Sequence, residues 1–120
     1  MKLDYDLIRD LLLVVEDISD GSINYPVENI QNDYLSNYEL KTIKYHVKQL
    51  AQGGIVEVPS SSIYSIIDLT WYGHQYLANI RDNNIWSKTK EYIKPFGTVT
   101  LDIISEVAKL FILKKLHLNP

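Results

Sequence analysis

The sequence contains no cysteine, which excludes a disulfide, a thiolate nucleophile and any cysteine-based zinc site. Its three histidines, His46, His74 and His117, are far apart, and none belongs to a His-x-x-x-His or Glu-x-x-His pair. Such spacings place metal ligands together on one helix face. We therefore expect no metal site and no bound cofactor.

The usual signatures of catalysis are also missing. No glycine-rich phosphate loop is present, because Gly53 and Gly54 follow a helical pattern instead of preceding one. The serines of the 60–62 stretch have no histidine near them in sequence. The carboxylates near the amino terminus are typical of a solvated acidic helix face. We therefore expect that the protein is not an enzyme.

Long apolar runs are absent. The densest run, Leu110–Leu113, has lysines on both sides and is far shorter than the roughly 20 residues that span a membrane. Met1 is followed by Lys2 and Asp4, where a signal peptide would begin its apolar core. These features, with the lack of cysteine, predict a cytoplasmic protein with no membrane partner.

Positive charge is scarce, and its distribution is uneven. The 120 residues carry a net charge of −3, and residues 1–35 alone hold two basic and eight acidic side chains. Residues 36–52 hold three lysines and one glutamate, and residues 86–120 hold six lysines and three acids. Positive charge is therefore confined to the central segment and the C-terminal third, where a polyanion could bind.

The central segment, residues 36–52, has the pattern of an amphipathic helix. Ser36 and Glu39 have capping-box spacing, and the glycine pair at 53–54 provides a stop. One face is apolar through Leu40, Ile43, Val47 and Leu50. His46, at the edge of that stripe, is expected to be buried and to donate a hydrogen bond to a backbone carbonyl.

The opposite face of this helix holds the candidate DNA-binding residues. The lysines are expected to approach phosphates, while the aromatic and polar side chains reach base edges or sugars. A solvated amphipathic helix without a ligand would have a similar pattern, so this alternative stays open. The candidates are Tyr38, Lys41, Thr42, Lys44, Tyr45, Lys48 and Gln49.

Around this helix we expect a first helix, capped by Asp4 and ending near Ser19, and a β-hairpin. Residues 22–34 have alternating apolar positions, a proline and several asparagines, which predict an extended segment with at most one helical turn near its end. The hairpin strands are predicted at 55–58 and 63–69, joined by a loop at 59–62.

Three helices are predicted after the hairpin. Thr70 caps a helix from Trp71 to about Ile80, Asn84 caps one over 85–94, and Thr98 or Thr100 opens the last one, to about 116. Both tryptophans, at 71 and 86, are expected to anchor the core. The predicted organisation is a domain over residues 1–94 and an appended C-terminal helix over 95–120.

The order helix, extended segment, helix, hairpin, helix resembles the winged-helix fold. The run Leu69-Thr70-x-x-Gly73-x-x-x-Leu77 is similar to that of many small bacterial winged-helix regulators. The start Met1–Arg9, the motif Tyr45–Leu50, Gly54–Val56, Ile80–Asp82 and the tryptophan-lysine motif at 86–90 resemble an uncharacterised family of small winged-helix proteins of Gram-positive bacteria and their phages. The resemblance covers residues 1 to about 94.

This resemblance implies an α+β, mainly helical fold: a winged helix, which is a helix-turn-helix variant with a two-stranded wing, plus C-terminal helices. It implies a bacterial or phage transcription regulator that binds double-stranded DNA. The alternative is a protein–protein interaction module, because the loop at 59–62 has no Arg or Lys and the segment where a second helix would lie is predicted to be extended.

The last helix is apolar over most of its circumference, so more than one neighbour must cover it. A second copy of the chain is one source of that cover, which predicts a homodimer with Ile104, Val107 and Phe111 at the interface. The alternative is that residues 85–94 fold back and cover the apolar stripe within one chain.

Overall fold

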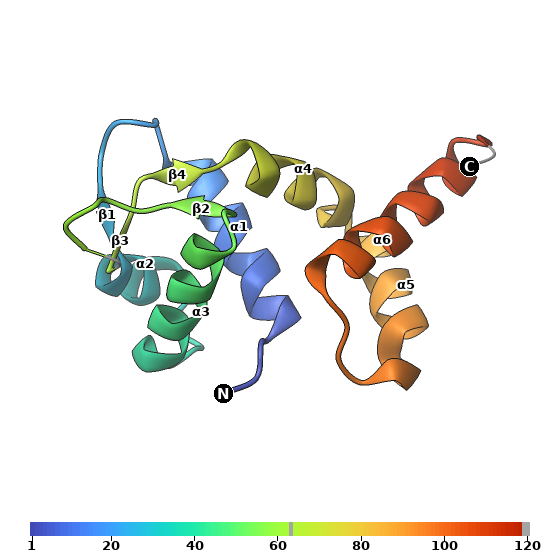
Figure 1. Ribbon diagram of the computed structural model, residues 1–120, viewed down its shortest axis with the longest axis horizontal. Coiled ribbons are helices and arrows are strands. Elements are labelled where there is room, and N and C mark those ends of the chain that lie inside the picture. The colour runs from blue at the N-terminus through green and yellow to red at the C-terminus, as the bar shows by residue number, and fades with distance from the viewer. Residues whose placement is uncertain (63, 119–120) are drawn as a thin grey trace. The chain divides into compact units, whose positions relative to one another are not determined.

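The chain is α+β and mainly helical, as expected. The computed structural model describes residues 1–62 and 64–118, which form six α-helices, one 3-10 helix and four short strands (Figure 1). They group into two compact units, residues 1–74 and residues 75–120, called unit 1 and unit 2 below. In the described residues, no helix combines the length and the apolar character needed to cross a bilayer.

Unit 1 begins with α1, Tyr5–Ile18, and its cap is the predicted one. The Asp4 Oδ1 atom accepts a hydrogen bond from the Leu7 backbone N–H at 3.0 Å. A carboxylate at this position satisfies one of the free N–H groups of the first turn and interacts favourably with the helix dipole. The inner face of α1 is fully buried at Leu7, Ile8, Leu11, Leu12 and Val15.

The segment after α1 differs from the prediction. Only β1, Tyr25–Pro26, is extended, and the chain then forms α2, Val27–Tyr34. Pro26 is the N-cap residue, where its missing N–H costs no helical hydrogen bond. Val27 and Ile30 are buried at i, i+3 spacing. Burial of this apolar pair stabilises a helix that the asparagine-rich sequence disfavours, so the predicted absence of a second helix was wrong.

The central helix α3 spans Leu40–Gln52 and begins three residues later than the predicted cap at Ser36 implies. Its N-cap is Glu39, whose side chain makes no capping bond, so the predicted capping box of Ser36 and Glu39 does not form. Its end is close to the prediction: Gly54 has a φ of 72°, a left-handed conformation that glycine adopts at little cost. The Ile55 N–H then donates back to the Leu50 carbonyl at 2.8 Å.

The hairpin forms, with one strand more than predicted. β2, Val56–Glu57, pairs antiparallel with β4, Asp68–Leu69. β3, Ser65–Ile66, pairs with β1 instead. Ile63, the predicted first residue of the second strand, lies outside the described residues.

The helix α4, Trp71–Ile80, follows the hairpin with the predicted local chemistry. Thr70 Oγ1 accepts from the Gly73 N–H at 3.0 Å and donates to the Ile55 carbonyl at 3.1 Å. A Cβ at Gly73 would clash with that carbonyl oxygen, so only glycine allows this close approach. Trp71, however, is 79% exposed, so the expectation that it anchors the core was wrong. Trp86 is 4% exposed and does anchor the core.

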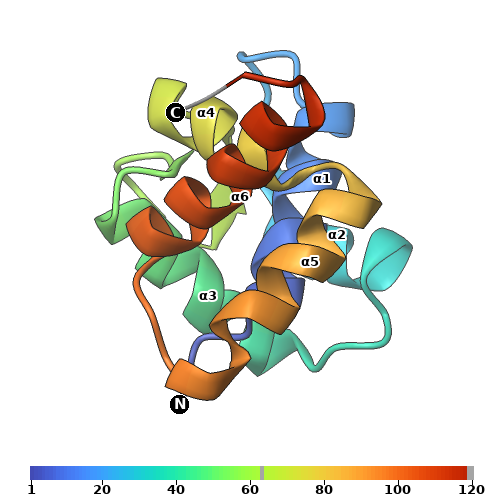
Figure 2. The same ribbon diagram turned by 90° about the vertical axis from the view of Figure 1, so that its right-hand side faces the viewer.

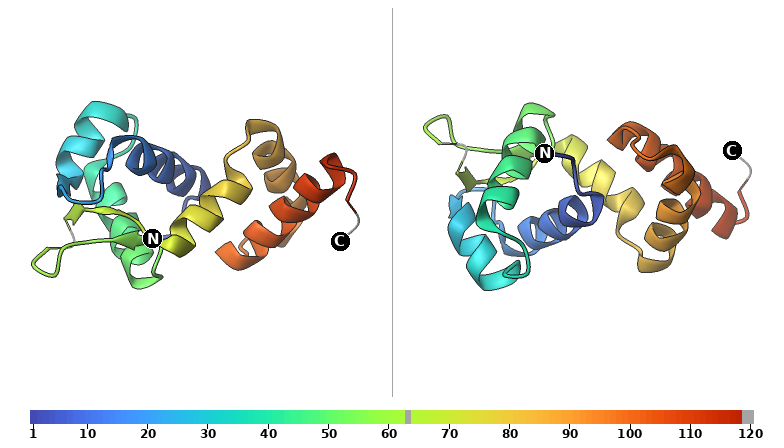
Figure 3. Two further views of the ribbon diagram at one scale, coloured as in Figure 1. Left: turned by 90° about the horizontal axis from the view of Figure 1, so that it is seen from above. Right: turned by 90° about the horizontal axis from the view of Figure 1, so that it is seen from below.

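Unit 2 contains the C-terminal part of α4 and two packed helices. These are α5, Asn83–Ile93, and α6, Leu101–Lys115, which lie side by side (Figure 2, Figure 3) and are joined through the 3-10 helix η1, Lys94–Phe96. Thr100 caps α6 as one of the two predicted candidates. Asp82, not Asn84, caps α5: its Oδ2 accepts from the Ile85 N–H at 2.9 Å.

The predicted organisation, a domain over residues 1–94 and an appended C-terminal helix over 95–120, stays a prediction. The two compact units of the structure divide between residues 74 and 75. The physical reason lies in α5, which packs mainly against α6. Pro95 and Gly97 lie in the tight turn between these two packed helices, and Gly97 has a φ of 73°.

Candidate nucleic-acid interface

The inner face of α3 is fixed in the core of unit 1. Ile43 and Val47 are fully buried and Leu50 is 2% exposed. Leu40, the fourth residue of the predicted stripe, is only half-buried. Each buried aliphatic side chain stabilises the fold by about 1.5–3 kcal/mol relative to an exposed one. The helix therefore has one permitted rotation about its axis, and its opposite face is presented to solvent.

His46 fastens this helix to the start of α1. Its Nε2 atom accepts a hydrogen bond from the Asp4 backbone N–H at 2.8 Å, and its Nδ1 atom lies 2.8 Å from the Thr42 carbonyl oxygen. Because Nε2 is an acceptor, the ring hydrogen is on Nδ1, which donates to that carbonyl. The side chain is fully buried. The sequence-based expectation for His46 is confirmed.

The turn before α3 is held by both preceding helices. Gln31 Nε2 in α2 donates to the Tyr38 carbonyl at 3.1 Å, and the Tyr38 hydroxyl donates to Asp10 Oδ2 in α1 at 3.1 Å. Burial, followed by the hydrogen bond and negative charge of Asp10, raises the pKa of Tyr38 to about 12. Tyr38 thus lies in the turn and contacts α1. It does not lie on the exposed face of α3, where it was predicted to be.

The remaining predicted DNA-contacting residues do share one face of α3. Lys41 and Lys48 are exposed, and Thr42, Lys44, Tyr45 and Gln49 are half-buried. Lys41 Nζ lies 3.6 Å from Glu39, but both side chains are about three-quarters exposed. Such a pair contributes little stability and is easily replaced by another anion. The ammonium groups of Lys41 and Lys48 therefore lie about two helical turns apart on an exposed surface, and only that of Lys41 has an ion-pair partner among the described residues.

Tyr64, which no sequence pattern marks as a candidate, adjoins this surface. The Lys44 ammonium lies 4.8 Å from the centre of the Tyr64 ring, a cation–π contact between α3 and the hairpin. The Tyr64 carbonyl accepts from the Val27 N–H at 2.9 Å, and its side chain is 53% exposed. Sequence alone showed only a tyrosine in a predicted strand, because the contact depends on how the hairpin folds back.

The predicted dimer residues have different environments within unit 2. Ile104 is fully buried within the chain, so its assignment to an intermolecular interface was wrong. Phe111 packs edge-on against Tyr92 of α5, with ring centres 6.0 Å apart. Val107 is half-buried. The segment 85–94 therefore covers part of the apolar stripe within the chain, as the alternative predicted, while Ile103 and Leu110 stay about half exposed.

Comparison with known proteins identifies a family. Residues 2–100 match the family described as "Hypothetical protein (DUF2513)". The chain belongs to this family.

One protein with a similar sequence is an "Uncharacterized protein" of Haemophilus influenzae. The two are 31% identical over 118 residues, an alignment that covers 93% of this chain and 96% of the relative. No solved structure matches the chain. The DUF2513 match spans unit 1, α4 and α5 and ends at the residue that caps α6. The more specific resemblance to Gram-positive and phage proteins stays a prediction.

Proposed function

We propose that this DUF2513 protein has a winged-helix fold and binds double-stranded DNA, as a transcription regulator of bacterial or phage origin. The observation that carries the proposal is the exposed face of α3, with Lys41 and Lys48 at its centre and a fully buried face behind it. The helix α2 supports it, because it supplies the first helix of a helix-turn-helix pair, which the sequence did not predict.

In this proposal α3 is the recognition helix, and the β2–β4 hairpin is the wing. An α-helix fits the major groove, and lysines beside it neutralise phosphates while polar side chains read base edges. Thr42, Tyr45 and Gln49 provide hydroxyl and amide groups on the same face. Lys44 is held against Tyr64, so it approaches the backbone from the wing side.

The charge of unit 1 limits where DNA can bind. Residues 1–74 contain five basic and eleven acidic side chains, so most of that surface repels phosphate. Three of the five cations are on α3. The proposed DNA contact of unit 1 is therefore confined to α3. The protein should bind a random duplex weakly, and its affinity should fall markedly as the salt concentration rises.

A gel-shift assay with a Lys41→Glu, Lys48→Glu double variant tests the proposal. Both side chains are exposed, so the fold should survive, and duplex binding should be lost because two phosphate contacts become repulsive. The matched control is Lys94→Glu with Lys109→Glu, an equal charge change on exposed lysines of unit 2. Equal affinity of the α3 double variant and the parent would remove α3 from the interface.

A second candidate function is supported by Trp71. This side chain is 79% exposed at the start of α4, and its neighbour Tyr72 is 39% exposed. Exposed tryptophan and tyrosine side chains are typical anchors of protein interfaces. In this alternative the chain is a protein–protein interaction module of a phage or its host. Trp71→Ala would then abolish partner capture and leave duplex binding unchanged, whereas the α3 double variant would have the opposite effect.

We also propose that the protein is a homodimer through the outer face of α6. Ile103 is 48% exposed and Leu110 is 49% exposed, and with the half-buried Val107 they form one stripe at helical spacing. This stripe differs from the predicted interface set of Ile104, Val107 and Phe111. In the structure Ile104 is in the core and Phe111 contacts Tyr92. A twofold dimer would pair the two stripes and present two copies of α3 to DNA.

A further inference from the structure

Unit 2 has a hollow in which three lysines meet. It has a volume of about 370 Å³ and lies between α5 and α6. Small-molecule sites commonly have volumes of about 300–1,000 Å³, so the space suffices for a small ligand. The lining side chains are Asn84 and Lys88 from α5 and Phe111, Lys114 and Lys115 from α6.

All three lysines are exposed. Among residues 1–62 and 64–118, neither Lys88 nor Lys114 nor Lys115 forms an ion pair. Three positive charges around one hollow repel one another, and an anion in the hollow would relieve that repulsion. A phosphate suits the position best, because its oxygens accept several charge-assisted hydrogen bonds at once. Asn84 adds an amide that can both donate and accept.

An aromatic surface adjoins the lysines. Phe111 and Lys88 also line a second hollow, of about 260 Å³, together with Glu91 and Tyr92. The Phe111 and Tyr92 rings meet edge to face at 6.0 Å, and Tyr92 is 61% exposed. Any nucleic-acid base can stack on such a ring, because every base has a planar π face. Cationic and aromatic groups therefore lie next to each other on one face of the α5–α6 pair.

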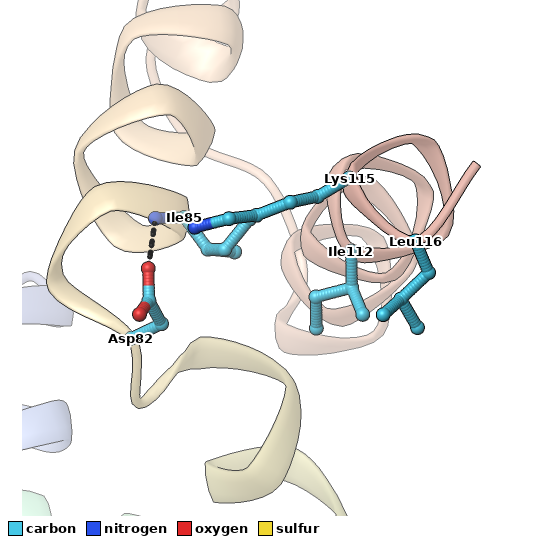
Figure 4. A pocket seen from close by; sticks show the side chains of 5 residues that line it. All are labelled: Asp82, Ile85, Ile112, Lys115 and Leu116. Atoms are coloured by element: carbon cyan, nitrogen blue, oxygen red, sulfur yellow. Dashed lines mark hydrogen bonds between the residues drawn. The ribbon is translucent and has the colours of Figure 1, made fainter.

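Next to Lys115 the surface is lined mainly by apolar side chains. A third hollow, of about 190 Å³, shares Lys115, and Figure 4 shows this side chain extending from α6 toward the first turn of α5. Ile112 and Leu116 lie beside it on α6. The Asp82 carboxylate near this turn accepts the capping hydrogen bond from the Ile85 N–H at 2.9 Å.

We infer that the α5–α6 face binds a nucleotide unit, with its phosphate among Lys88, Lys114 and Lys115 and its base on Phe111 and Tyr92. This inference does not rest on the proposed function, since it involves no residue of α3. The same chemistry is offered by a free mononucleotide and by a nucleotide within a single strand. Double-helical DNA does not offer it, because its bases are stacked and paired.

Isothermal titration of the full chain with adenosine 5′-monophosphate tests the inference. Two further probes, a ten-residue oligothymidylate and inorganic phosphate, separate the possible sources. The test variant is Lys88→Gln with Lys114→Gln, which should weaken the nucleotide roughly tenfold or more by removing two charged contacts. The matched control is Lys94→Gln with Lys109→Gln, which removes equal charge from exposed positions that line none of the three hollows.

A second variant, Phe111→Leu, keeps an apolar side chain and removes the stacking ring. It should reduce the affinity for the nucleotide to that for inorganic phosphate. Tighter binding of the oligothymidylate than of the mononucleotide, lost in the Lys88→Gln, Lys114→Gln variant, would identify a single strand as the source. The inference is overturned if the mononucleotide does not bind at millimolar concentration, if both lysine pairs weaken it equally, or if inorganic phosphate binds the parent as tightly as the nucleotide.

Discussion

Units 1 and 2 have net charges of opposite sign, and their lysines have different surroundings. Residues 1–74 hold five basic and eleven acidic side chains, whereas residues 75–120 hold seven basic and four acidic ones. Unit 1 nevertheless presents Lys41 and Lys48 on a rigid helix face, with Lys44 beside them. In unit 2 the lysines at 88, 114 and 115 surround a hollow. In both proposals the positions of a few cations, and not the net charge of the unit, select the anion.

The largest effect is expected from breaking the core that holds α3. Val47→Asp should destabilise the protein by roughly 4 kcal/mol or more, because an unpaired carboxylate would enter a fully buried site. Thermal denaturation followed by circular dichroism measures the change. Lys48→Asp, at the adjacent exposed position, is the control and should change stability by less than about 1 kcal/mol. Equal melting temperatures for Val47→Asp and the parent would contradict this packing.

A smaller loss is expected at the link between α3 and α1. His46→Ala should cost about 2 kcal/mol, because it removes a fully buried ring and leaves the partly buried Asp4 N–H without its acceptor. Urea denaturation gives the value. The matched control is His74→Ala, since His74 is exposed. A His46→Ala variant as stable as the control would show that the two hydrogen bonds of this ring do not fix α3.

The outer face of α6 gives a prediction about assembly. Leu110→Glu should weaken the proposed dimer about tenfold or more, or about 1.4 kcal/mol, because a charge would replace an apolar side chain at the interface. Light scattering over micromolar concentrations measures it, with Lys109→Glu as the control on the same helix. Phe111→Glu is a poorer probe, because its contact with Tyr92 lies within the chain. A parent protein with the mass of one chain would exclude the dimer.

The smallest effect concerns the turn before α3. The pKa of Tyr38 is raised from 10.0 to about 12, so the folded state holds the phenol proton more tightly than the unfolded state. The stabilisation from this proton is therefore complete below pH 10 and is lost as the pH rises through about 12. Tyr38→Phe should cost about 1 kcal/mol at neutral pH and make stability less sensitive to pH in that window.

A carbon-13 tyrosine titration followed by NMR tests the cause of this shift. The pKa of Tyr38 should be about 12, above its ordinary value of 10.0. A pKa of Tyr38 close to the ordinary value would show that the Asp10 contact does not hold the turn in solution.

The sequence predicted the elements whose ends carry their own chemistry. Asp4, Thr70 and Thr100 each cap the helix that follows. These signals are local, because a capping side chain bonds within its own first turn. The candidate residues on α3 could be found for the same reason, since periodicity alone separates the buried face from the exposed one.

The parts that were missed depend on contacts distant in sequence. The helix α2 is stabilised by burial of Val27 and Ile30, which no local propensity shows. Tyr38 bonds a residue 28 positions away, and Tyr64 contacts α3 through the fold of the hairpin. Trp71 was expected to be buried because tryptophan usually is, and its position at an exposed helix start overrides that tendency.

The central claim is that duplex DNA is bound by the few lysines of α3, in the unit whose net charge is negative. The salt dependence of binding to a random duplex, measured by fluorescence anisotropy, tests it most directly. Each phosphate contact contributes about −0.9 to the slope of log K against log salt, so three lysines predict a slope of about −3 for each bound chain. Lys41→Gln with Lys48→Gln, which removes two contacts without adding repulsion, should bring the slope to about −1, and Lys94→Gln with Lys109→Gln should leave it unchanged. The account is contradicted if the slope is the same in the α3 double variant or falls only in the unit 2 variant.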